Sequence, residues 1–299
     1  MSSLIRNVAV VGASGNLGRF VVTELLDAGF TVTALTREGS TATFPAGVAS
    51  KTVDYSSVGS LTAALDGQDA LVSTIATAAV AGQQPLVDAA VAAGVKRIIP
   101  SEFGLNTRFL GKDPVATILQ GKIKTLNYIH EKWKQNPSFT WTGISTGLFF
   151  DWTFQPSPNG FDKTTKTATI YDSGNEPFQA TNLTLIGKAV AAVLKHPELT
   201  TNRYISIASF NPSQNQVLEL AEKITGEKWT VNKVSTSEQH KIGLEKLSKG
   251  DYSAFSNFLR KRIHEDGAGL AVQGPDNALE LLGLVGENLE ESVRAWLAK

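Results

Sequence analysis

The chain has 299 residues, of which 42% are hydrophobic and 19% are charged, a composition typical of an ordinary globular protein. Its 28 basic side chains balance its 28 acidic ones, so the chain has no net positive charge that would attract the phosphates of a nucleic acid. The absence of cysteine excludes disulfides, thiolate nucleophiles and cysteine-bound zinc, and the four histidines show no metal-ligand spacing.

The first hundred residues alternate between strand-like and helix-like segments. Short apolar, β-branched runs predict strands over 7–13, 30–37, 48–55, 69–76 and 95–104. Amphipathic runs ended by glycine predict helices over 16–29, 57–68 and 82–94. A helix over 118–135 and a strand over 138–146 follow. This alternation predicts an α/β fold, a doubly wound parallel sheet of the Rossmann type with helices on both faces.

Neither the amino terminus nor any apolar run predicts export or a membrane span. The first residues continue directly into the strand-like run at 7–13, without a separate apolar segment and cleavage site. The longest weakly polar run, at 70–82, is too short and too rich in serine and threonine to cross a bilayer. We therefore expect a cytoplasmic protein, a monomer or a homodimer, with no membrane partner.

The regular alternation of strand-like and helix-like segments ends near residue 150. Residues 151–182 are rich in turn formers and poorly periodic. Helices are predicted over 183–197 and 213–226 and strands over 202–209 and 229–236, and the remainder reads as mostly helical. We expect residues 1–150 to form the dinucleotide-binding domain. Residues 151–299 would form a smaller, mostly helical substrate lobe, with some segments such as 202–209 returning to the main sheet.

A glycine-rich bend joins the first strand to the first helix. The spacing Gly12-x-x-Gly15-x-x-Gly18 follows an apolar strand and opens an amphipathic helix. Such a bend points backbone N–H groups and the positive helix end at a pyrophosphate, although a plain strand–helix turn is the alternative. The spacing resembles that of the short-chain dehydrogenase/reductase superfamily. The bend supplies six candidate coenzyme contacts: Gly12, Ser14, Gly15, Asn16, Leu17 and Gly18.

The end of the second strand bears on the choice between NAD and NADP. A site for NAD places Asp or Glu there, whereas a site for NADP places an arginine that pairs with the 2′-phosphate. The first charged residue after the strand is Arg37, followed by Glu38. This order favours NADP, and the alternative is that both are solvated loop charges.

Four stretches together resemble a known family. They are "VVGASGNLG", "VDYSSVGSLTAALDGQDALVSTIA", "QQPLVDAAVAAGVKR" and "VKRIIPSEFG", the last ending in a specific P-S-E-F-G signature at 100–104. The sequence closely resembles the NmrA-like, isoflavone-reductase-like atypical short-chain reductases. These include phenylcoumaran benzylic ether, pinoresinol–lariciresinol and isoflavone reductases. The resemblance is strong over about 1–150 and diffuse afterwards. It implies an NADPH-dependent reductase of a small aromatic or conjugated substrate, such as an isoflavone, benzylic ether, enone or quinone.

The resemblance also implies a catalytic lysine on the helix after P-S-E-F-G. The family pattern places it at Lys122, with Ile129 seven residues later, although Thr125 replaces the usual aliphatic. Lys124 is the fallback. An ammonium beside the nicotinamide ribose could stabilise a developing oxyanion, and a lysine of lowered pKa could instead act as a general base. The alternative for any helix lysine is a solvated surface charge.

The same helix carries a second candidate, the Y-x-x-x-K spacing of Tyr128 and Lys132. At about 100° per residue, Tyr128 lies roughly 120° around the helix from Lys122. The two cannot both face one coenzyme, so we expect Tyr128 to pack or to lie at the rim.

Further candidates lie at the predicted carboxyl ends of the strands, where ligands of such sheets bind. Four of them are expected to flank the coenzyme: Ile75, Ala76, Phe103 and Thr146. For Phe103 this expectation comes from the family resemblance. Four apolar residues could wall an aromatic substrate: Leu148, Phe149, Phe150 and Trp152. Phe154 and Phe178 are weaker candidates of the same kind. The alternative for each is ordinary core. His130 and His264 are interpreted as structural or surface residues.

Two rival functions remain open on the same scaffold. One is a redox-sensing regulator that binds NADP without turnover and acts through a protein partner. The other is a non-redox cyclase or dehydratase that leaves the coenzyme unused. Lys122 argues modestly against the sensor, because such sensors often lack this lysine.

Overall fold

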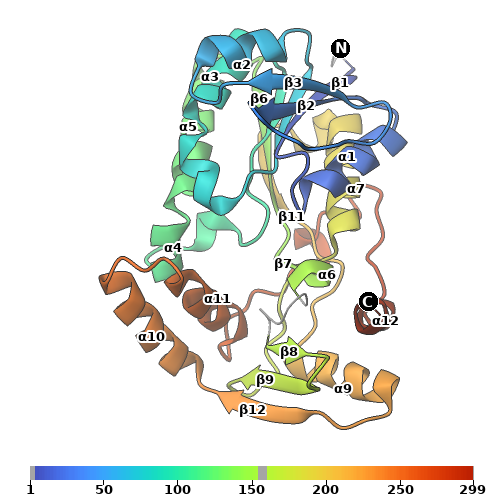
Figure 1. The fold of residues 1–299 in the computed structure, drawn as a ribbon, viewed down its shortest axis with the longest axis vertical. Coiled ribbons are helices and arrows are strands. Elements are labelled where there is room, and N and C mark those ends of the chain that lie inside the picture. The colour runs from blue at the N-terminus through green and yellow to red at the C-terminus, as the bar shows by residue number, and fades with distance from the viewer. Residues whose placement is uncertain (1–3, 154–159, 299) are drawn as a thin grey trace.

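The computed structural model describes residues 4–153 and 160–298, and its main body is a seven-stranded sheet (Figure 1). Every neighbouring pair of strands runs parallel, in the order β11-β6-β5-β4-β1-β2-β3. The strands are β1 (Asn7–Val11), β2 (Thr31–Arg37), β3 (Ala49–Val53), β4 (Ala70–Ser73), β5 (Arg97–Ile99), β6 (Thr140–Ser145) and β11 (Arg203–Ser206). This order, reversing its direction at β1, confirms the predicted doubly wound α/β fold.

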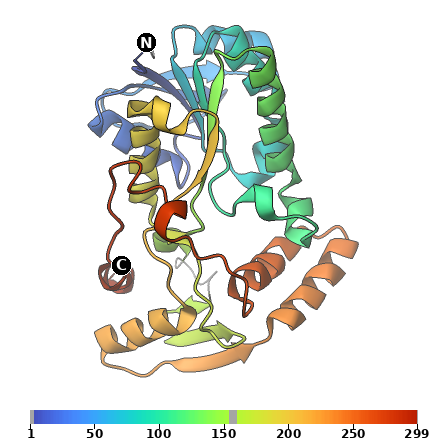
Figure 2. The same cartoon turned by 180° about the vertical axis from the view of Figure 1, so that it is seen from behind.

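Helices cover both faces of this sheet (Figures 1 and 2). Helices α1 (Gly18–Asp27) and α7 (Leu183–Lys195) pack on one face, and α2 (Val58–Leu65), α3 (Gln84–Ala92) and α5 (Gln120–Gln135) on the other. The strand pleat divides the core accordingly, because successive side chains point to opposite faces. In β1, Val8 and Val10 join the α1/α7 cluster, whereas Ala9 and Val11 join the other cluster.

The second half of the chain adds a smaller lobe beyond the carboxyl ends of the strands (Figure 1). It contains a three-stranded sheet, β12-β9-β8, with an aromatic core in which the rings of Phe161, Trp229 and Trp296 lie 6.0–6.3 Å apart. Its main elements are β8 (Phe161–Asp162), β9 (Thr167–Tyr171), β12 (Thr230–Val234), α9 (Gln214–Thr225), α10 (Thr236–Ser248), α11 (Ala254–His264) and α12 (Leu289–Ala298).

Short elements connect the two parts. Strand β7 (Leu148–Phe149) pairs with β10 (Ala180–Thr181), and α4 (Pro114–Ile118) packs against α11. The remaining short elements are α6 (Phe150–Thr153), α8 (Pro197–Thr200) and the 3-10 turns η1 (Thr77–Gly82), η2 (Thr107–Phe109) and η3 (Gly274–Asp276).

Most predicted elements of the first 150 residues are present, and the return of 202–209 to the main sheet is confirmed by the pairing of β11 with β6. The predicted helix over 118–135 is interrupted at Leu119, where α4 ends and α5 begins. Strands β8, β9 and β10 were not predicted. They are two to five residues long, and β9 pairs with β12 about sixty residues later, so local periodicity carries little signal for them.

Candidate active site

The glycine bend lies at the carboxyl end of β1, against the end of β4. Gly12 has φ of +77°, and a Cβ atom there would come within 2.9 Å of the Thr74 main chain. Thr74 in turn donates from its N–H and its hydroxyl to the carbonyl of Val11, both at 2.9 Å. Only glycine fits this left-handed, crowded position. The ends of the two strands are therefore held together where a ligand of such a sheet would lie.

The start of α1 packs directly on this bend. A Cβ atom on Gly18 would lie 2.0 Å from the carbonyl oxygen of Gly12, which also accepts from the N–H of Gly15 at 2.9 Å. Within the described part of the chain, the N–H groups of Asn16 and Leu17 have no acceptor. Free amides at the positive end of a helix form an anion-binding cradle, so the residues present fit a pyrophosphate.

Arg37 is the last residue of β2, the neighbour of β1. Its side chain is exposed and makes no hydrogen bond or ion pair with any residue that the structure describes. Leu35 pairs with Val11, so Arg37 projects just beyond the level of the glycine bend. Glu38 follows and is also exposed. The guanidinium is therefore available to an anionic group bound beside the bend.

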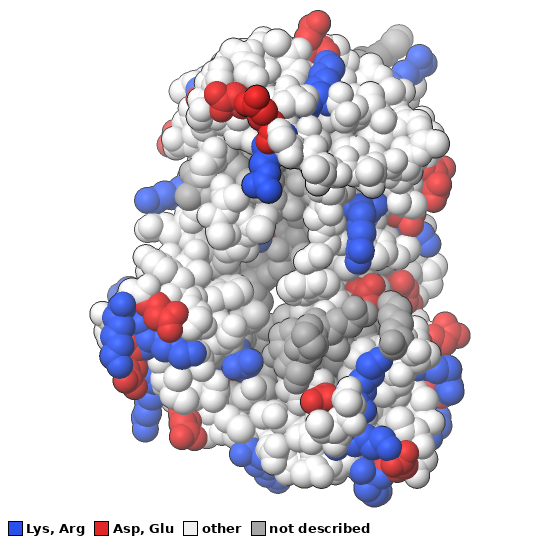
Figure 3. Space-filling view, in the orientation of Figure 1, with Lys and Arg blue, Asp and Glu red and all other residues white. Residues whose placement is uncertain are grey.

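The segment after β4 completes this edge of the sheet. Ile75 is half-buried and Ala76 is exposed, and the carbonyl of Ile75 accepts from the Ser101 hydroxyl at 2.7 Å. Ser101 belongs to the P-S-E-F-G segment that follows β5. The two strand ends are thus joined directly. Figure 3 shows this face of the molecule hollowed between the main body and the C-terminal lobe.

Lys122 lies in the first turn of α5 and is only 6% exposed. Its ammonium nitrogen donates to the carbonyl of Phe103 at 2.9 Å and to that of Glu102 at 3.4 Å. Burial lowers the pKa of Lys122, and the nearby charge of Glu102 opposes this effect. Lys124, the fallback, is exposed. Of the two lysines, Lys122 is therefore the one held against the strand ends.

Phe103 and Thr146 hold the loops around Lys122. Phe103 is 5% exposed, and Thr146 is fully buried. The Thr146 hydroxyl accepts from the N–H of Gly104 at 3.0 Å, and the N–H groups of Thr146 and Gly147 both donate to the carbonyl of Gly104 at 3.0 Å. Gly104 has φ of +120°, which favours glycine. These contacts tie the carboxyl end of β6 to the loop that receives the lysine.

Tyr128 and Lys132 contact the neighbouring helix α3. The Tyr128 hydroxyl donates to a carboxylate oxygen of Asp88 at 2.7 Å, and the Lys132 ammonium lies 2.6 Å from the same oxygen. The Lys132 nitrogen also lies 4.9 Å from the centre of the Tyr128 ring. These three side chains form a contact between two helices, separate from the strand ends that surround Lys122.

The predicted substrate-wall residues divide by burial. Leu148, Phe150 and Phe178 are buried, whereas Phe149 is half-buried and Trp152 is 39% exposed. Phe149 and Trp152 meet edge to face with ring centres 6.4 Å apart. This pair therefore presents the accessible aromatic surface after β6. Phe154 lies outside the described residues.

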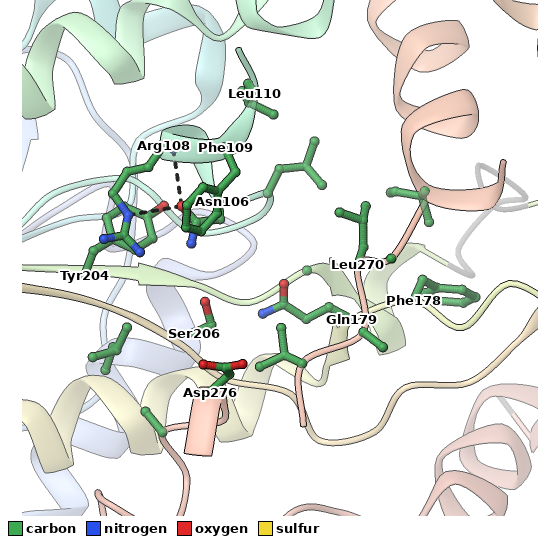
Figure 4. A pocket seen from close by; sticks show the side chains of 18 of the residues that line it. Asn106, Arg108, Phe109, Leu110, Phe178, Gln179, Tyr204, Ser206, Leu270 and Asp276 are labelled. Atoms are coloured by element: carbon green, nitrogen blue, oxygen red, sulfur yellow. Dashed lines mark hydrogen bonds between the residues drawn. The ribbon is translucent and has the colours of Figure 1, made fainter. Parts of the chain in front are cut away.

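A cavity of about 450 Å³ lies beside the edge strand β11. Figure 4 shows Asn106, Arg108 and Tyr204 at one end and Phe178 and Leu270 at the other. The Arg108 guanidinium lies over the Tyr204 ring, 4.3 Å from its centre. Tyr204 was not identified from the sequence, since a tyrosine in a strand is ordinary. It connects the cavity to a buried acid.

That acid is Glu102, which is 1% exposed. Its carboxylate accepts from the Tyr204 hydroxyl at 2.9 Å and from the Thr107 hydroxyl. Burial raises the pKa of Glu102, and the Lys122 charge is the largest opposing influence. In the sequence, Glu102 stands out only as part of the P-S-E-F-G signature. A charged residue three positions after a buried strand was the available signal.

The described residues contain no group of three or more His, Asp or Glu side chains that could hold a metal ion. His264 is 3% exposed and stacks on Tyr171. His130 is half-buried against Trp141, with ring centres 4.4 Å apart. In the part of the chain that the structure covers, we find no helix both long and apolar enough to cross a membrane.

Comparison with known proteins agrees with this architecture. The NmrA-like family model matches residues 5–257. The chain belongs to the NmrA-like family. It is 36% identical to Oxidoreductase aprR of Aspergillus flavus over 294 residues, which cover 97% of this chain and 98% of that protein.

Solved structures of this fold cover almost the whole chain. Leucoanthocyanidin reductase of Vitis vinifera in complex with NADPH superposes with a TM-score of 0.84 at 22% identity, over 98% of this chain and 100% of that one. AtPrR2 with NADP+ and (+)pinoresinol superposes with a TM-score of 0.82 at 21% identity, over 99% and 100%. At these identities the likeness shows a shared fold.

Proposed function

We propose that this protein is an NADPH-dependent reductase of a small aromatic or conjugated molecule, with Lys122 as its functional lysine. The observation that carries the proposal is the position of the buried Lys122 ammonium. It lies at the carboxyl ends of the strands, as do the N–H groups of the glycine bend that have no acceptor among the described residues. The relative aprR is named an oxidoreductase, and both fold neighbours were solved with NADP+ or NADPH.

The coenzyme would be held by groups that the protein already has in place. The N–H groups of Asn16 and Leu17 would bind the pyrophosphate, and Arg37 would pair with the 2′-phosphate that distinguishes NADP from NAD. Ile75 and Ala76 would flank the ribose beside them. When bound, the nicotinamide supplies a hydride.

Lys122 would handle the charge that hydride transfer leaves on an oxygen of the substrate. An ammonium has three N–H donors, and the carbonyls of Glu102 and Phe103 take two of them. The third is left for a substrate oxygen. A buried ammonium acts through a low dielectric, so its stabilisation of an oxyanion is stronger than that of a solvated lysine.

An aromatic substrate is supported by the accessible rings after β6. Phe149 and Trp152 offer an edge-to-face pair at the boundary with the C-terminal lobe, and we propose that this lobe shapes the substrate pocket. The fold neighbour AtPrR2 was solved with pinoresinol, a molecule with two aromatic rings.

The test is NADPH consumption with a panel of quinones, enones and phenolic benzylic ethers. We expect turnover by the native chain and a loss of roughly 100-fold or more in Lys122→Ala, because general acid–base or oxyanion assistance contributes on this scale. Lys124→Ala, which changes an exposed lysine two positions away, is the matched control and should retain full turnover.

Other results would favour the rival functions. Tight NADPH binding without turnover of any substrate in the panel would favour a redox sensor. Product formation without NADPH would favour a cyclase or dehydratase. Calorimetry that detects binding of neither NADPH nor NADH would refute the proposal together with the redox-sensor rival.

A further inference from the structure

Glu102 and Lys122 are two oppositely charged groups buried close together. Their side chains are 1% and 6% exposed, respectively. Among the described residues they form no direct ion pair within 4 Å, and Lys122 instead donates to the main-chain carbonyls of Glu102 and Phe103. The charge of each still acts on the other. The carboxylate thus influences the lysine through space and leaves its third N–H free.

The groups facing this pair come from two other elements. Thr107 and Arg108 lie on η2, and Tyr204 lies on β11. The two hydroxyls donate to the Glu102 carboxylate, and the Arg108 charge also acts on it. The pKa of Tyr204 is raised well above its usual value by burial and by Glu102, so this phenol stays protonated and remains a donor. Every one of these neighbours favours the ionised carboxylate.

We propose that Glu102 is a positioning residue for Lys122: its carboxylate, held by Thr107 and Tyr204, keeps the buried lysine an ammonium. This inference rests on the proposed role of Lys122 and deepens it. The sequence left two roles open, an oxyanion-stabilising ammonium and a neutral general base. An ionised Glu102 favours the ammonium, because a nearby opposite charge stabilises the charged form of the lysine.

The hydrogen bonds to Glu102 explain how two charged groups, whose burial costs free energy, are kept in the interior. Burial alone would favour a neutral amine at Lys122 and a protonated acid at Glu102, as it opposes any isolated charge. Two hydroxyl donors to one carboxylate, together with the charge of Lys122, oppose this preference at Glu102. The ionised acid then supports the ammonium, whose remaining N–H can serve a ligand. Without Glu102, Lys122 would lose its proton at a lower pH.

The test observes Lys122 directly and requires no turnover. In protein carrying 13C-labelled lysine, the Cε chemical shift reports protonation of each lysine across a pH titration, and Lys122→Met identifies the resonance. We expect Lys122 to be an ammonium at pH 7 in the native chain. In Glu102→Gln, which keeps the shape and an acceptor oxygen, its titration midpoint should fall by about one pH unit or more.

Control variants separate this electrostatic role from a structural one. Glu131→Gln removes the charge of an exposed acid on α5 and should leave the Lys122 midpoint unchanged. Tyr204→Phe removes one donor to Glu102 but keeps the ring under Arg108, so it should shift the midpoint in the same direction by less. If Glu102→Gln does not fold, Tyr204→Phe provides the same test.

The outcomes distinguish this inference from the function on which it rests. A neutral Lys122 at pH 7 in the native chain would overturn it, as would an unchanged midpoint in a folded Glu102→Gln. Both results are independent of NADPH turnover, which tests the proposed function separately. If turnover is found, its loss at high pH should begin at a lower pH in Glu102→Gln, since the ammonium is then lost earlier.

Discussion

Acid should destabilise this protein through one buried histidine, His264. The ring is 3% exposed, stacks on Tyr171 with centres 5.4 Å apart and meets Phe178 edge-on at 5.1 Å. Its Nδ1 atom has no hydrogen-bond partner among the described residues. Burial, assisted by the charge of Arg260, lowers the pKa of His264 to about 3. Protonating this ring therefore requires the surrounding apolar contacts to open.

The size of the effect follows from the two pKa values. An unfolded histidine has a pKa of 6.5, so between pH 6.5 and about 3 the unfolded state binds a proton that the folded state does not. Stability is fully present above pH 6.5 and falls as pH falls through this window. Between pH 7.5 and pH 5, His264 alone should remove about 2 kcal/mol from the free energy of unfolding.

Urea unfolding at the two pH values, followed by tryptophan fluorescence, measures this loss. Trp229 and Trp296 lie in the core of the same lobe and report its opening. In His264→Phe, which keeps an aromatic ring, the drop in stability between pH 7.5 and pH 5 should be about 2 kcal/mol smaller than in the native chain. His196→Gln changes an exposed histidine and should leave the drop unchanged. Equal drops in the native chain and His264→Phe would refute the reasoning.

Three further changes test the coenzyme edge and the second helix candidate. Arg37→Asp should lower the affinity for NADPH by roughly tenfold or more and leave that for NADH less affected, as calorimetry with both would show. Gly18→Ala should abolish coenzyme binding or folding, since its Cβ would meet the Gly12 carbonyl at 2.0 Å, and circular dichroism separates the two outcomes. Tyr128→Phe should cost about 1 kcal/mol of stability by removing the bond to Asp88, with turnover unchanged; a lost turnover would restore the Tyr128–Lys132 pair as the candidate.

The main sheet was predictable because each of its elements carries a local signal. Buried parallel strands read as apolar β-branched runs, and the helices between them are amphipathic and end at glycines such as Gly29 and Gly94. The C-terminal lobe lacks such signals. Residues 265–288, expected to be mostly helical, contain only the short turn η3, and their contacts are made with distant segments such as β11.

The candidate site was predictable to a similar extent. A glycine that must avoid a clash, such as Gly18, and a lysine in a family pattern, such as Lys122, are visible in the sequence. The contribution of β11 was not visible. Tyr204 lies 102 residues after Glu102 in the chain, and only the pairing of β11 with β6 places its hydroxyl on that carboxylate. A contact created by sheet order has no local pattern.

The P-S-E-F-G segment shows how one signature can serve several physical demands at once. The Ser101 hydroxyl donates to the segment that follows β4, Glu102 places its carboxylate between two hydroxyls, and the carbonyl of Phe103 accepts from Lys122. Gly104 adopts a φ that favours glycine and pairs with the end of β6. Only the Phe103 side chain was expected to contact the coenzyme directly. Moving this segment would displace three strand ends together. If its backbone and buried acid orient the lysine, its position is therefore constrained as strongly as that of a segment that touches the ligand.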